Sequence, residues 1–328
     1  MNIDEFRPEA FERGGKYALY LRLTGPASEV TMPVLLVRGH EGGSTLVATA
    51  GVHGDEYEGV RAIYDVYTRL DPSAMSGDFL AVPVSNPPAF WNASRTSPLD
   101  GGNLARVFPG SLEAGVTEAI AYWIANAIIS RADLYIDLHS GGISWLYPTM
   151  IGYDARDTRS AAAARAFGTK ILWAHPNMSP GRSVTFASER GIPWLYTEAR
   201  GAGRIDAGDL VTFVRGVLNL FYYLNILKGV PEVTPIDCHL YGDGDLDDTL
   251  MAGQAGFLVT DCGLLQAVCA GEPLGRLCDL LGETLEVYRA PMDGVIAVVR
   301  ALPVVQRGDP VFIVTGVLPE SAQQGLDR

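Results

Sequence analysis

The first residues that could do chemistry lie in the run GVHGDE, residues 51–56. Glycines on both sides of His53 allow a sharp turn, which can direct the imidazole of His53 and the carboxylate of Glu56 at one ion. Imidazole nitrogen and carboxylate oxygen are both common ligands of Zn²⁺. A single His-x-x-Glu spacing also occurs without a metal, so a purely structural role for this pair stays open at this point.

A second histidine favours the metal-binding interpretation. His139 lies in DLHSGG, residues 137–142, at the end of a strand-like run and directly before a glycine turn. Two histidines and a glutamate are typical of catalytic zinc sites, because this set leaves one coordination position for water. The sequence therefore indicates a zinc site on His53, Glu56 and His139. Asp137 either orients His139 or is simply a polar residue at the strand end.

Two further segments carry charged side chains that could serve such a site. Segment 86–110 is rich in Gly, Pro and Asn, and it contains Arg95, Asn103 and Arg106. Long irregular loops in compact domains are usually functional, so one arginine could stabilise an oxyanion while the other holds a carboxylate. Glu198 ends another strand-like run and is a candidate general base. Taken alone, each arginine and Glu198 would be interpreted as a surface charge.

These side chains need a scaffold that places strand ends side by side. From about residue 30 to 228, apolar runs of strand length alternate with stretches of helical period, which is typical of an α/β layer fold. We expect buried strands at 45–52, 79–84 and 134–138, and helices at 58–70, 116–131 and 209–227. The last of these helices has Asp209 as its expected N-cap. Ligands of open α/β sheets gather at the carboxyl ends of strands, where His53 and His139 are expected.

The pattern changes after residue 228. Segment 228–237 has two prolines and a glycine, so it is expected to end the last helix and to connect two domains. Beyond it, short β-type runs separated by Gly and Asp-Gly predict a small all-β barrel or sandwich. We therefore assign residues 1–230 to an α/β domain and residues 231–328 to a β domain.

Composition and charge exclude several classes of function. The 328 residues include 25 Lys and Arg against 38 Asp and Glu, and the net charge of −13 disfavours a nucleic-acid partner. No apolar run approaches the roughly 18 residues that a membrane-spanning helix needs, and the first residues show no apolar signal core. The four cysteines form no CxxC pair. We expect a cytoplasmic protein with no membrane partner.

Five motifs in order resemble the succinylglutamate desuccinylase/aspartoacylase family, a branch of the zinc carboxypeptidase-like hydrolases. They are HGDE, NPPAFWNASR, DGGNLARVFPG, DLHSGG and TEARG, and together they are far more specific than any one alone. The resemblance implies one Zn²⁺ per chain on His53, Glu56 and His139. It implies that Glu198 is the general acid/base and that Arg95 polarises the substrate carbonyl.

The resemblance also has implications for the fold and the substrate. It implies a carboxypeptidase-like α/β zinc-hydrolase domain with a mixed central sheet, followed by a smaller β domain. It makes Arg106, beside Asn103, an anchor for a substrate carboxylate. The family loop commonly reads Asn-Leu-Asn-Arg, whereas Ala105 stands here in place of the second asparagine and cannot donate an amide hydrogen bond. DGGN…FPG and GVTEAIAYW look most like the subgroup of N-acetyl-diaminobutyrate deacetylases.

The C-terminal region has a resemblance of its own. Segments 290–295 and 304–310 resemble the hairpin pattern of lipoyl/biotinyl-type barrels, which carry a modifiable lysine at a β-turn. This chain has no lysine after Lys228, which excludes a swinging-arm role. We expect this region to shape the entrance of the site or to form an oligomer contact.

The sequence thus predicts a zinc-dependent amidohydrolase that removes a small acyl group, acetyl or succinyl, from an N-acyl amino acid. N-acetyl-diaminobutyrate is the first substrate to consider. Two alternatives stay open, namely a metallocarboxypeptidase acting on short peptides and a non-catalytic ligand-binding protein. The expected partners are a small-molecule substrate and further copies of the chain in a homo-oligomer.

Overall fold

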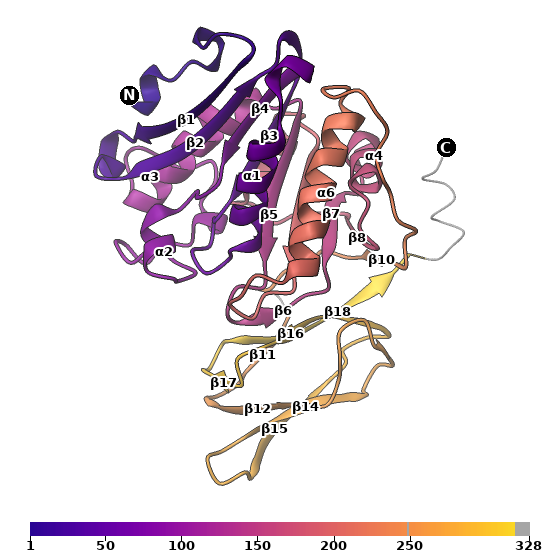
Figure 1. The fold of residues 1–328 in the computed structure, drawn as a ribbon. Helices are drawn as coiled ribbons and strands as arrows, with labels where there is room; N and C mark the ends of the chain where they lie inside the picture. The colour runs from indigo at the N-terminus through magenta and orange to yellow at the C-terminus, as the bar shows by residue number, and fades with distance from the viewer. Residues whose placement is uncertain (248, 319–328) are drawn as a thin grey trace.

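A large mixed sheet runs through the protein, whose computed structural model describes residues 1–247 and 249–318 (Figure 1). In spatial order its strands are β1 (Gly15–Arg22), β2 (Thr31–Arg38), β4 (Ser76–Val82), β3 (Glu41–Ala50), β5 (Leu134–Ser140), β9 (Trp194–Ala199), β7 (Met150–Asp154), β8 (Ile171–His175), β10 (Cys238–Tyr241), β18 (Pro310–Val317), β16 (Gly294–Arg300) and β13 (Ala267–Val268). Two short strands join at the side, β6 (Trp145–Leu146) on β16 and β11 (Leu250–Met251) on β18. A separate antiparallel sheet comprises β15 (Thr284–Arg289), β14 (Pro273–Cys278), β12 (Gly256–Thr260) and β17 (Val304–Val305).

Helices cover both faces of the N-terminal part of this sheet. On one face lie α1 (Glu58–Arg69), α4 (Thr158–Phe167) and α6 (Ala207–Tyr223), with α1 and α6 side by side (Figure 1). On the other face lie α3 (Val116–Trp123) and α5 (Ser183–Glu189), and the short α2 (Pro87–Trp91) begins the loop before them. Side chains alternate between the two cores: Leu46 and Ala48 of β3 join the first, and Val47 joins the second. Because both faces are buried, the central strands are almost continuously apolar.

The expected strands at 45–52, 79–84 and 134–138 are present as β3, β4 and β5, with shifted ends. The helix expected at 58–70 is α1, whereas the one expected at 116–131 is α-helical only to Trp123 and continues as one π-turn and one 3₁₀ turn. The prediction of Asp209 as N-cap was wrong. Asp206 caps α6 instead, accepting hydrogen bonds from the backbone N–H of Gly208 at 2.8 Å. Asp209 is buried and accepts from the Thr149 hydroxyl and the Arg200 N–H.

The C-terminal part both extends the large sheet and has a core of its own. β10 pairs in parallel with β8, and β18 pairs antiparallel with β10. Leu258, Leu277 and Phe312 belong to a separate cluster of buried apolar side chains, between β12, β14 and β18. The division at residue 230 stays a prediction, and the end of the proposed β domain, 319–328, lies outside the described residues.

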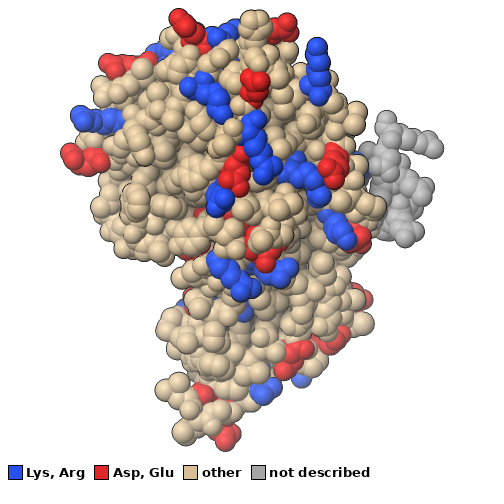
Figure 2. All heavy atoms as spheres, viewed as in Figure 1, with Lys and Arg blue, Asp and Glu red and all other residues tan. Residues whose placement is uncertain are grey.

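The surface carries charges of both signs. Figure 2 shows Lys and Arg interspersed with Asp and Glu on the face drawn, over both the α/β part and the β part.

All four cysteines carry free thiols, and Cys278 is the buried one. In the part of the chain that the structure describes, no helix combines the length and the apolar character that a membrane span requires.

Candidate functional site

The ends of three neighbouring parallel strands position the predicted site. β5 lies between β3 and β9, and all three run in the same direction, so their carboxyl ends meet. His139 near the end of β5 is directly opposite Glu198 of β9. His53 follows β3 in a turn that needs glycine on both sides: Gly51 has φ +58°, and a Cβ on Gly54 would come within 2.0 Å of the Ala89 carbonyl carbon.

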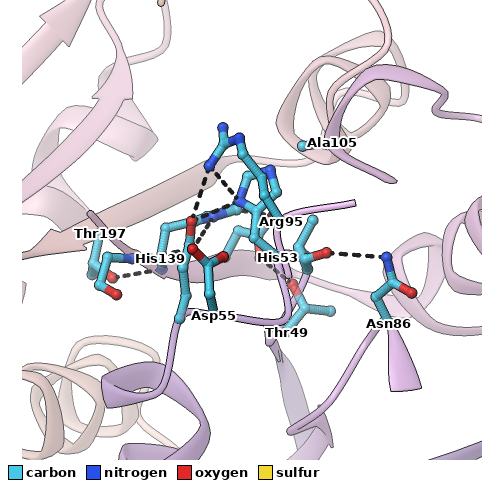
Figure 3. Close-up of polar contacts among 12 residues, drawn as sticks. Thr49, His53, Asp55, Asn86, Arg95, Ala105, His139 and Thr197 are labelled. Carbon is cyan, nitrogen blue, oxygen red and sulfur yellow. Dashed lines mark hydrogen bonds and ion pairs between the residues drawn. The ribbon is translucent and has the colours of Figure 1, made fainter. Parts of the chain in front are cut away.

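His53 and His139, both labelled in Figure 3, face the buried carboxylate of Glu56. His53 Nδ1 lies 2.7 Å from Glu56 Oε1, and His139 Nδ1 lies 2.9 Å from Glu56 Oε2. Each of the three residues can offer one ligand atom, and these atoms all lie within 4.8 Å of one another. The structure therefore brings together the three ligands that the sequence predicted.

The other ring nitrogen of each histidine has an acceptor. His53 Nε2 lies 3.2 Å from Asn103 Oδ1, and His139 Nε2 lies 3.1 Å from Asp137 Oδ2. An oxygen acceptor at Nε2 holds the proton there and leaves the Nδ1 lone pair for a metal, as in many histidine metal sites. Of the two roles left open for Asp137, this contact supports the orientation of His139. Asn103, which we expected at the substrate, turns its amide oxygen to His53.

The electrostatics fit a bound cation. Burial would raise the pKa of Glu56, but the two neighbouring imidazoles lower it well below its usual value. Burial lowers the pKa of His53 to about 4, assisted by the positive charge of Arg95. Burial also disfavours charge on His139, yet the carboxylates of Asp137 and Glu56 raise its pKa well above normal. The two carboxylates therefore favour a positive charge at His139, and a divalent metal on the same donors would supply one.

Glu198 lies in the same pocket as these ligands. Its Oε2 is buried and has no hydrogen-bond partner among the described residues. Burial, together with the charge of Glu56, raises the pKa of Glu198 well above the usual glutamate value. A carboxyl group with a raised pKa is suited to accept a proton and to return it during catalysis.

Arg95 reaches the cluster from the loop after α2 (Figure 3). Its Nη1 lies 3.3 Å from His53 Nδ1 and 3.4 Å from Glu56 Oε1. These groups lie in one pocket that opens to solvent. Side chains of the α/β part line it together with the loop that follows β10.

Comparisons with known proteins bear directly on this pocket. The succinylglutamate desuccinylase/aspartoacylase catalytic domain matches residues 42–224. The N-alpha-acetyl-L-2,4-diaminobutyric acid deacetylase of Halomonas elongata is 32% identical over 298 residues, which are 88% of this chain and 86% of that protein. The chain belongs to the succinylglutamate desuccinylase/aspartoacylase family.

Solved structures of this family have the same fold. A succinylglutamate desuccinylase/aspartoacylase from Rhodobacter sphaeroides matches with a TM-score of 0.83 and 28% identity, over 94% of this chain and 98% of that one. The ectoine utilization protein EutE (DoeB) from Ruegeria pomeroyi, in a product-bound structure, matches with a TM-score of 0.84 and 28% identity, over 93% and 96% of the two chains. The large mixed sheet and the separate antiparallel sheet are thus the architecture of the desuccinylase/aspartoacylase fold.

In this member of the desuccinylase/aspartoacylase family, Arg106 was predicted to anchor a substrate carboxylate. It lines the pocket, but its guanidinium already has a carboxylate partner. Its Nε donates to Asp247 Oδ2 at 2.6 Å. Beside it, Arg182 Nη2 donates to Asp245 Oδ1 at 2.7 Å. Both aspartates lie in the loop after β10, so the C-terminal part of the chain contributes to the pocket of the α/β part.

Sequence reasoning missed several side chains of the pocket, namely Arg182, Trp145 and Tyr147. Arg182 precedes α5 in a loop with no distinctive spacing, and both aromatic residues follow the DLHSGG turn in a stretch that resembles an ordinary apolar run. No local signal distinguishes them from core residues. Their place at the pocket follows from how the strands pair.

Proposed function

We propose that this protein is a zinc-dependent hydrolase that removes an acyl group from the nitrogen of an amino acid, with N-acetyl-diaminobutyrate as the first substrate. The observation that carries the proposal is one pocket in which two histidine Nδ1 atoms face Glu56 and Glu198 lies nearby, with its Oε2 lacking a hydrogen-bond partner among the described residues. The deacetylase activity in the name of the Halomonas relative supports acetyl as the acyl group. We further propose that the enzyme is a cytoplasmic homo-oligomer.

His53, Glu56 and His139 would hold the zinc, whose contribution when bound is Lewis acidity toward the acyl carbonyl and a lowered pKa of water. Glu198 accepts a proton from the attacking water and passes it to the nitrogen of the leaving amine. Arg95 donates hydrogen bonds to the oxygen that becomes negative as water adds to the carbonyl carbon. The C–N bond then breaks, and a carboxylic acid and a free amine result.

Arg106 is the proposed anchor for the carboxylate of the substrate. It is part-buried at the pocket, whereas its partner Asp247 is 62% exposed. A substrate carboxylate and Asp247 would compete for the same guanidinium, which a bidentate carboxylate contact suits well. Asn103 would assist only indirectly, since its amide oxygen contacts His53.

Replacing Asp247 by asparagine is expected to lower the KM by about two- to fivefold, because an exposed ion pair contributes only about 0.2–1 kcal/mol. The substitution releases Arg106 for the substrate and leaves the proton-transfer groups unchanged, so kcat should stay the same. The measurement is a Michaelis curve for each enzyme. Asp261→Asn is the matched control, since Asp261 forms an exposed pair with Arg276 away from the pocket. A raised KM in Asp247→Asn would show that Asp247 assists binding instead.

A substrate panel tests the proposed function. Purified protein reconstituted with zinc is offered acetyl, succinyl and formyl derivatives of diaminobutyrate, aspartate and glutamate, together with short peptides. We expect fastest release of acetate from N-acetyl-diaminobutyrate. Cleavage confined to the C-terminal residues of peptides would favour the metallocarboxypeptidase alternative. Zinc bound at one ion per chain with no turnover of any compound would favour a ligand-binding protein.

A further inference from the structure

We propose that Trp145 is a positioning residue, whose indole holds the guanidinium of Arg95 at the reacting carbonyl and is itself held by the C-terminal strand β16. The proposal rests on the function proposed above, since it assigns Trp145 to the arginine that serves that reaction. It also assigns a task to the C-terminal strands, namely support of the active site across the boundary between the two parts of the chain.

The first step is the contact between the two side chains. The Cζ atom of Arg95 lies 4.8 Å from the centre of the Trp145 ring, within the range of a cation–π interaction. Trp145 lines the pocket and is 7% exposed, so this contact is largely shielded from water. Cation–π contacts are stronger when they are desolvated.

The contact with the indole leaves the N–H donors of the Arg95 guanidinium available. The hydrogen bonds that the structure describes for the Arg95 guanidinium go to His53 Nδ1 and Glu56 Oε1, the same atoms that face a metal. A metal on those atoms would occupy both hydrogen-bond partners of Arg95. Of the contacts described for its guanidinium, the one with the Trp145 indole would then remain. A ring face holds a guanidinium without using its in-plane N–H donors. These donors are then free for the substrate oxygen.

Strand β16 supports Trp145 itself. β6, which contains Trp145, pairs antiparallel with β16 where the two parts of the chain meet, with Trp145 opposite Arg300 (Figure 1). The Ala301 N–H donates to the Ser144 carbonyl at 2.8 Å, beside that pair. Trp145 also packs in a cluster with Ala297 and Val298 of β16. The strand pairing therefore sets where the indole lies.

Arg300 completes the support from the C-terminal side. Its guanidinium lies 6.0 Å from the Trp145 ring centre, and its Nη2 donates to Asp309 Oδ2 at 2.7 Å. The Arg300 side chain is only 8% exposed, and its contact with Asp309 is part-buried. The indole is thus in contact with one arginine from each part of the chain.

A double-mutant cycle tests whether Trp145 acts through Arg95. We expect Trp145→Leu to lower kcat by about tenfold with little change in KM, since Arg95 acts on the transition state, and Trp145→Phe to retain most of kcat. In an Arg95→Gln background, Trp145→Leu should have no further effect. The matched control is Trp123→Leu in α3, which should leave kcat unchanged because the Trp123 indole donates to the Thr24 carbonyl and does not line the pocket. The proposal is overturned if Trp145→Leu reduces kcat by the same factor with or without Arg95, or if the control loses as much.

A measurement without turnover separates this inference from the proposed function. In a ¹H–¹⁵N spectrum, the Nε–H signal of Arg95 is assigned as the signal that is absent from the spectrum of Arg95→Gln. In the zinc-loaded protein we expect the indole to shift this signal upfield, and Trp145→Leu to remove that shift while Trp123→Leu leaves it. An Arg95 signal that is identical with and without Trp145 overturns the inference. An unreactive wild type that retains the shift would overturn the proposed function, while the contact between the two side chains would stand.

Discussion

Glu198→Gln is expected to lower kcat by about a thousandfold while one zinc ion per chain stays bound, because general acid–base catalysis typically contributes 10²–10⁴-fold. Glutamine has nearly the same shape as glutamate but cannot accept the proton of the attacking water. The side chain is not among the three ligands, so the metal content should not change. The measurements are steady-state rates on the best substrate of the panel and metal analysis of the same preparation.

The pH dependence of the wild type gives a second test of Glu198. Burial raises its pKa, and only the deprotonated form accepts a proton, so kcat/KM should fall on acidification at a pH above the ordinary glutamate range. Glu198→Gln should lack this acid limb. Glu189→Gln, an exposed glutamate on α5, is the matched control and should behave as the wild type. Substantial hydrolysis by Glu198→Gln, or an unchanged acid limb, would contradict the proposed role.

Removal of zinc is expected to abolish hydrolysis and to lower the Tm, and added zinc should restore both. A metal that binds only the native state stabilises it by about 2.7 kcal/mol at a free concentration one hundred times Kd. For a chain of 328 residues, that corresponds to a shift of roughly 4 °C. The measurements are activity and thermal unfolding after chelation, then after stepwise return of zinc. Full activity in a preparation without metal would contradict the proposed centre.

Glu56→Gln tests the same metal centre by changing one of its proposed ligands. Glu56 provides the only carboxylate that both histidine Nδ1 atoms face among the described residues, so a neutral amide there should lower zinc affinity by orders of magnitude. Because the carboxylates of Asp137 and Glu56 raise the pKa of His139 in the absence of metal, a proton competes with zinc for this imidazole, and zinc binding should weaken as the pH falls. Glu113→Gln, at an exposed site, is the control. Stoichiometric zinc in Glu56→Gln would argue for a different ligand set.

Local sequence was sufficient to predict the candidate metal ligands. His53 and Glu56 are three residues apart in one turn, and His139 follows one strand, so their placement depends on strand ends and on glycine turns. The alternation of strand and helix then predicts parallel neighbouring strands, whose carboxyl ends meet. The position of His139 opposite Glu198 depends instead on β5 pairing with β9, which follows β6, β7 and β8 in the sequence, and no local pattern predicted that pairing.

The assignment of Asp209 as N-cap shows where local pattern was insufficient. Asp206 and Asp209 are both suitable caps by residue type, and they are three residues apart. Asp209 is instead buried against Thr149 and the backbone of Arg200, which come from other parts of the chain. Tertiary contacts, and not the local sequence, therefore decide which of the two aspartates caps α6.

By itself, then, the sequence determined the α/β class, the order of the motifs and the three side chains that can surround one metal. Neighbouring residues encode each strand and each glycine turn, whereas the contact of His139 with Glu56 also requires β3 to pair with β5. Only the tertiary structure placed Asp247 on Arg106 and β16 beside Trp145. Those contacts join segments more than 140 residues apart, and they depend on how β10 and β16 pair with the rest of the protein, which no local spacing encodes.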